Sequence, residues 1–171
     1  MPLVTTALLE LLQRAVLIGA GATLVMDVWA LFLGRCFGIP SLNFAMVGRW
    51  VGHLPRGRFR HENIARSEPV HGEALLGWAA HYGIGIVFAA LLLGVVGIPW
   101  TLQPTLAPAL LFGVLSVAAP FFILQPGLGA GIAASKTPHP NTARLRSLMA
   151  HAVFGAGLYL TAWILTHVHA G

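Results

Sequence analysis

Residues 73–97, EALLGWAAHYGIGIVFAALLLGVVG, decide the fold of this chain. At 1.5 Å per residue a helix of this length crosses the ~30 Å hydrocarbon core of a bilayer. The stretch carries Glu73 at its start and His81 inside, and on a helix these two residues alternate with Gly77 and Gly85 at four-residue spacing along one ridge. Glycines in such a ridge let a neighbouring backbone approach closely, so we expect both glycines to be helix-packing positions.

The composition places the whole chain in a membrane. Of 171 residues 57% are hydrophobic and 9% are charged, whereas roughly a quarter of the residues of a soluble domain are charged. We therefore predict an all-α polytopic protein, with residues 1–171 forming a single integral membrane domain. The single cysteine, Cys36, excludes an intramolecular disulfide framework.

Three further apolar stretches join the first in a predicted four-helix bundle. The four spans are expected at about residues 15–34, 74–97, 106–124 and 148–168. In the third span, Pro120 should kink the helix, and Gln125–Pro126 should end it.

The segment 35–72 is the one long hydrophilic loop. Within it, residues 41–54 have apolar side chains at helical spacing opposite Arg49 and His53, which predicts an amphipathic helix lying at the membrane interface with Trp50 as its anchor.

Basic residues orient the predicted bundle. The formal net charge is +5, and nine of the ten Lys and Arg residues fall in two of the loops. The first loop holds six and the third holds three, while the second loop and the C-terminal tail hold none. This distribution is typical of membrane topology and not of nucleic-acid binding, so no nucleic-acid partner is expected and the lipid bilayer is the expected surrounding. By the positive-inside rule the first and third loops are cytoplasmic and both termini lie outside.

Ionisable residues inside three of the spans form the candidate site. An aspartate at the centre of a membrane helix costs about 2.5 to 3.5 kcal/mol, so Asp27 needs a polar partner. Counting residues from the predicted cytoplasmic ends places Asp27, His81 and His151 in one layer of the inner leaflet, with Glu73 and Tyr82 near it.

Three hypotheses compete for this polar layer. In the first, the side chains hydrogen-bond one another and only lock the helices together, as in a purely structural membrane subunit. In the second, a carboxylate and histidines take part in proton- or ion-coupled transport or sensing. In the third, Asp27, His81 and His151 hold a metal ion or a haem, with or without enzymatic activity. The chain has no HExxH motif, nucleophile elbow or cofactor fingerprint, which argues against an enzyme.

Spare glycines point to self-association. Gly77 and Gly85 in the second span, and Gly155 and Gly157 in the fourth, offer more close-approach surface than four helices need. This surplus predicts a homodimer.

Three motifs together resemble a known family. They are HGEALLGWAAHYGIGIVFA at 71–89, QPGLGAGIAASKTP at 125–138 and RLRSLMAHAVFGAGLYL at 144–160. The chain is similar over nearly its whole length to small bacterial four-helix membrane proteins of a domain family of unknown function. The resemblance implies a bacterial inner-membrane protein with four helices, and it brings no catalytic residues.

Overall fold

The computed structural model describes residues 2–168, and within that part of the chain it contains helices and no strands. The predicted all-α class is therefore confirmed. The helices in chain order are α1 (Pro2–Phe37), α2 (Phe44–His53), α3 (Glu73–Val96), α4 (Leu106–Ser116), α5 (Gln125–Leu128) and α6 (Pro140–Val168). Short 3-10 turns lie between them at η1 (Leu54–Arg56), η2 (Ile64–Arg66), η3 (Ile98–Thr101) and η5 (Ile132–Ala134), and a π-helical turn, η4 (Pro120–Leu124), precedes α5.

Within the part of the chain that the structure describes, four helical stretches are long and apolar enough to cross a membrane: Leu8–Phe37, Glu73–Val96, Leu106–Leu128 and Pro140–Val168. The second agrees with the predicted 74–97 to within one residue at each end. The first and the last helices begin earlier than predicted, at Pro2 and Pro140 in place of residues 15 and 148. An apolar run in the sequence marks only the part of a helix that lies in lipid. Both helices extend beyond that part, because backbone hydrogen bonds also form in turns that contain polar residues.

The third span is a broken helix. Pro120 interrupts it as expected, because proline removes a backbone donor, and the chain passes through the π-helical turn before α5 resumes. The predicted end at Gln125–Pro126 is wrong, since Pro126 lies in the first turn of α5, where its missing N–H costs little. The helix ends instead at Gly129, whose φ of 94° suits glycine.

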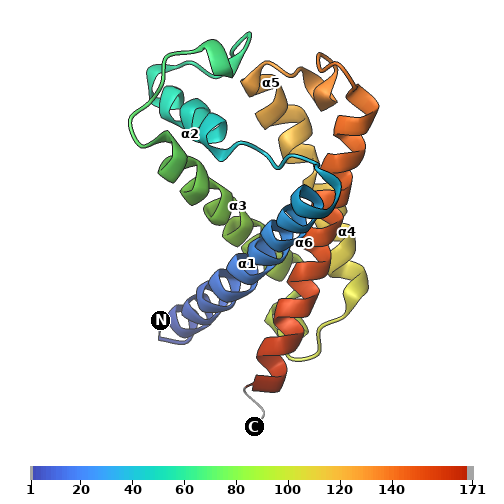
Figure 1. Cartoon of the computed structure of the whole chain (residues 1–171). Coiled ribbons are helices and arrows are strands. Elements are labelled where there is room, and N and C mark those ends of the chain that lie inside the picture. The colour runs from blue at the N-terminus through green and yellow to red at the C-terminus, as the bar shows by residue number, and fades with distance from the viewer. Residues whose placement is uncertain (1, 169–171) are drawn as a thin grey trace.

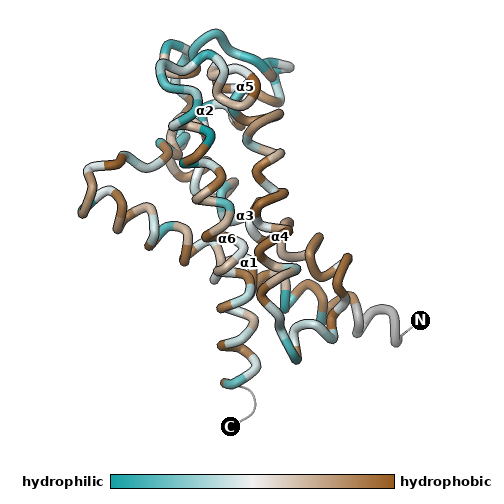
Figure 2. The backbone as a smooth tube through the Cα atoms, turned by 90° about the vertical axis from the view of Figure 1, so that its right-hand side faces the viewer, coloured by the Kyte–Doolittle hydropathy of each residue, from teal (hydrophilic) through white to brown (hydrophobic). Residues whose placement is uncertain are grey.

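α1 lies between α3 and α6, and α4 packs on the far side of α6 (Figure 1). The start of α1 and the end of α6 lie at one end of the bundle, and α2 and α5 lie at the other (Figure 1). Figure 2 shows hydrophobic residues along the spans and a more hydrophilic chain around α2 and α5. We call this end, made of residues 44–72 and 125–139, the cap. The core of the bundle holds small and branched apolar side chains from every span, among them Ile18, Ala22, Ala89, Leu92, Ala109 and Leu158.

Glycines set the close approaches between the spans. Gly85 of α3 packs on Thr23 of α1, and Gly155 of α6 packs on Gly113 of α4. Gly77 packs on the backbone of α2, and Gly157 on the backbone of α1. The glycines from which a homodimer was predicted thus pack against helices of the same chain. Self-association stays a prediction, but these glycines no longer support it.

α2 is shorter and more deeply packed than the predicted interfacial helix at 41–54. It begins at Phe44 because the Asn43 side chain accepts a hydrogen bond from the N–H of Ala45 at 3.0 Å. Its Gly48 lies directly on the backbone of the first turn of α3. The indole N–H of Trp50, the predicted interfacial anchor, donates to the carbonyl of Phe59 at 2.9 Å. Its role as an anchor stays a prediction.

Candidate functional site

Asp27 of α1 holds two side chains of α3. One carboxylate oxygen lies 2.9 Å from Nε2 of His81, and the other accepts a hydrogen bond of 3.0 Å from the hydroxyl of Tyr82. The side chains of Asp27 and His81 are 20% and 11% exposed, so the pair is mostly buried but not completely enclosed. Both carboxylate oxygens are thereby satisfied inside a membrane span, which removes much of the cost of placing an aspartate there.

Aromatic rings surround the imidazole of His81. Phe44 at the start of α2 lies 4.3 Å from it between ring centroids, and Tyr82 and Trp78 lie 5.6 Å and 5.8 Å away. An ionised carboxylate can only accept a hydrogen bond, so Nε2 of His81 is protonated and donates to Asp27. Its Nδ1 has no hydrogen-bond partner among residues 2–168.

His151 does not join this pair, which corrects the expectation that three ionisable residues meet. Its Nδ1 lies 2.7 Å from the hydroxyl oxygen of Ser116, and that hydroxyl lies 2.6 Å from the carbonyl of Gly113. The carbonyl can only accept, so the serine donates to it and accepts from His151. The physical reason is packing, because the His151 side of α6 faces α4 and not α1.

The three side chains proposed as metal ligands, Asp27, His81 and His151, are therefore not placed around one common point. Within residues 2–168 no three His, Cys, Asp or Glu side chains gather closely enough to hold a metal ion. The two histidines lie in separate hydrogen-bonded pairs on different helix interfaces.

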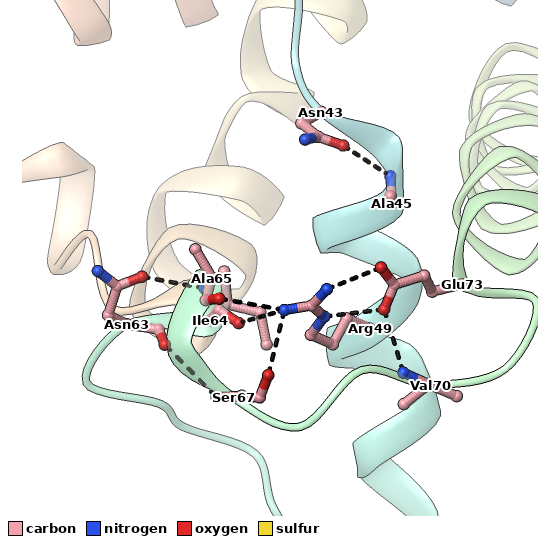
Figure 3. Close-up of polar contacts among 9 residues, drawn as sticks. All are labelled: Asn43, Ala45, Arg49, Asn63, Ile64, Ala65, Ser67, Val70 and Glu73. Atoms are coloured by element: carbon pink, nitrogen blue, oxygen red, sulfur yellow. Dashed lines mark hydrogen bonds and ion pairs between the residues drawn. The ribbon is translucent and has the colours of Figure 1, made fainter.

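Glu73 also lies outside the intramembrane site. Its carboxylate receives two hydrogen bonds of 2.8 Å from Nε and Nη2 of Arg49 in α2, and a third, of 3.1 Å, from the N–H of Val70 (Figure 3). This bidentate pair ties α2 to the first turn of α3. The hydrogen bonds from Arg49 to Glu73 raise the pKa of the guanidinium.

Arg49 organises the cap through its remaining nitrogen. Nη1 donates to the carbonyls of Ile64, Ala65 and Ser67 at 3.4, 3.2 and 3.1 Å, so one guanidinium gathers the η2 turn around α2 (Figure 3). The sequence pattern placed Arg49 and His53 on the solvent side of α2, and that prediction is wrong. They are 8% and 0% exposed, because the loop after α2 folds back over this face.

Two histidines close the cap across the bundle. Nδ1 of buried His53 lies 2.8 Å from Nε2 of His61, and both the backbone N–H and Nδ1 of His61 bond to the carbonyl of Gly127, at 3.0 and 3.1 Å. His61 must donate from Nδ1 to that carbonyl, so in the neutral pair its Nε2 accepts from His53. We call this arrangement the histidine clasp, and it joins the first hydrophilic loop to α5 at the end of the third span.

The sequence pattern of a family described as "Protein of unknown function (DUF2938)" matches residues 16–165. The chain belongs to the DUF2938 family. The matched range includes every residue of the two polar pairs, the Arg49 network and the histidine clasp. The resemblance seen in the three sequence motifs is confirmed to this extent. Neither a curated protein nor a solved structure matches the chain.

The structure of this DUF2938 member also has an open hollow near the site. Its volume is about 480 Å³, and it is lined by the end of α1, including Leu31 and Gly34, and by the connection of residues 38–43 to α2. Asp27 precedes Leu31 by four residues and Gly34 by seven, so all three lie on the same face of α1. Sequence reasoning missed the hollow, since only the return of the chain from α1 to α2 creates it.

Proposed function

We propose that this protein is a small integral protein of the bacterial inner membrane that binds a proton at Asp27, His81 and Tyr82, as part of transport or sensing. The observation that supports it best is the 2.9 Å contact between a membrane-embedded carboxylate and an imidazole with a free nitrogen. Histidine is the side chain that changes charge near neutral pH, and ionisable residues inside membrane spans commonly mark proton pathways.

The hollow supports proton exchange with one side of the membrane. The Asp27 side of α1 continues into it one helical turn later, at Leu31. A proton that enters through hydrated headgroups therefore has a short path to the carboxylate. In the proposed topology this side is the cytoplasm, and both termini lie in the periplasm.

Histidine NMR on the protein in lipid nanodiscs tests the proton site. Between about pH 5 and pH 8 the ring signals of His81 should change with protonation, and Asp27→Asn should alter that change. The signals of His167, on the exposed last turn of α6, should be unaffected by Asp27→Asn. Signals of His81 that stay constant over this range would leave the polar pair as a structural lock and overturn the proposal.

Fusions test the proposed topology separately. Alkaline phosphatase attached after Gly171 should be active, because it works only in the periplasm. A green fluorescent fusion at the same residue should be dark, and bright fluorescence would reverse the orientation.

A further inference from the structure

The hollow at the end of α1 has two kinds of wall. Ala30, Leu31 and Ile39 supply apolar surface, and Arg35, Ser41 and Asn43 supply a guanidinium, a hydroxyl and an amide. Arg35 lies in the last turn of α1, where a spanning helix reaches the level of the headgroups. The walls of the hollow therefore change from apolar to basic at the depth where a phospholipid changes from acyl chain to phosphate.

The charge of Arg35 is not used within the described chain. Arg14, Arg49 and Arg144 each have hydrogen-bond partners in the protein, but Arg35 has none among residues 2–168. Its side chain is exposed and lines the hollow, so it offers a bidentate donor to an incoming anion.

The apolar wall continues along the helix towards the middle of the bilayer. Leu24, Val28 and Leu31 follow one another at helical spacing on α1 and are 55%, 58% and 51% exposed. An acyl chain fits such a strip, whereas a free phosphate would have no contact with it. The joined basic hollow and apolar strip match the two parts of one ligand.

We infer that the hollow binds one anionic glycerophospholipid, with its phosphate at Arg35, Ser41 and Asn43 and an acyl chain along Leu31 and Val28. Basic pockets on the cytoplasmic side of membrane helices are suited to anionic headgroups. The inference stands independently of the proposed proton site, because it rests on the hollow and Arg35 and not on Asp27 or His81. A hydrated headgroup there would still leave a path for protons.

Native mass spectrometry of the full chain released from nanodiscs tests this inference. Nanodiscs with equal amounts of phosphatidylglycerol and phosphatidylcholine should yield a protein that retains one phosphatidylglycerol. Arg35→Gln should weaken that binding about fivefold. This is the change in affinity expected from the loss of one basic side chain near an anionic lipid. Arg35→Lys should weaken it less, because the charge remains.

Arg56→Gln is the matched control, since Arg56 is exposed on the same end of the molecule but lies outside the hollow. It should retain the lipid as the wild type does. Equal losses in Arg35→Gln and Arg56→Gln would show diffuse attraction and overturn the inference. So would equal retention of the two lipids, or displacement of the lipid by millimolar inorganic phosphate.

Discussion

Nε2 of His81 lies 2.9 Å from Oδ1 of Asp27, and this contact joins α1 to α3 across 54 positions of sequence. Tyr82 reaches the other carboxylate oxygen from the same helix. Each helix therefore depends on the other to satisfy polar groups that lipid cannot hydrate.

A double-mutant cycle of Asp27→Ala and His81→Ala, each of which removes the hydrogen bond, measures this dependence. The coupling energy should be about 0.6 to 1.7 kcal/mol, the range found for hydrogen bonds between membrane helices. The measurement is the free energy of unfolding in mixed micelles. Tyr82→Phe serves as a comparison, and should cost about 0.5 to 1.5 kcal/mol, as expected for one lost hydrogen bond. Additive effects of the two single changes would show that the contact does not hold in the membrane.

The contact between α2 and α3 should not tolerate a methyl group. A Cβ at Gly77 would meet the carbonyl of Phe44, whereas one at Gly83 of the same helix would meet nothing within 4 Å. Gly77→Ala should therefore destabilise the protein by about 1 to 3 kcal/mol through overpacking. Gly83→Ala should be neutral or stabilising by up to about 1 kcal/mol, because alanine favours the helix. Thermal unfolding in detergent compares the two, and equal stabilities would contradict the close packing of α2.

Arg49 should protect the cap from proteolysis. Lysine keeps the charge but cannot reproduce the two bonds to Glu73 together with the three bonds to η2 carbonyls. Arg49→Lys should thus speed tryptic cleavage at the exposed arginines of the loop after α2. Arg56→Lys, which leaves a tryptic site at an exposed position, should not change the rate elsewhere in that loop. If Arg49→Lys left the cleavage rate unaltered, the guanidinium would not hold the loop.

The side chain of His61 should hold the cap closed. His53 and His61 share one hydrogen between nitrogens 2.8 Å apart, and Nδ1 of His61 donates to the carbonyl of Gly127. Amide exchange in residues 57–67 of the protein in nanodiscs measures whether this loop stays closed.

His61→Ala should raise that exchange, since it removes the side-chain bonds of His61 to His53 and to Gly127 and leaves only the backbone bond to Gly127. His71→Ala changes an exposed histidine in the same loop and should behave as the wild type. Protection of residues 57–67 that is the same in the wild type and in His61→Ala would show that the clasp does not close the cap.

The amino-acid sequence alone determined the membrane class, the helical fold and the bounds of α3. Apolar runs of bilayer length can satisfy their backbone groups in lipid only as helices, so these features follow from composition and need no tertiary information. The requirement for a partner of Asp27 followed in the same way, because its desolvation cost is a property of the residue.

Only the tertiary structure decided which groups meet. Depth along a span predicted one layer for Asp27, His81 and His151, but the rotation of each helix sent His151 to Ser116 instead. The spacing of residues determines which of them share a face of one helix. It does not determine which neighbouring helix that face packs against.

The cap depended on tertiary structure still more. Arg49 and His53 are polar residues of an amphipathic helix, and their pattern predicts a solvated face. They are buried because the loop of residues 54–72 returns over them and brings Glu73, His61 and backbone carbonyls as partners. A polar side chain can be buried wherever its hydrogen bonds are replaced, and here the replacements come from outside α2, 8 to 24 positions along the chain.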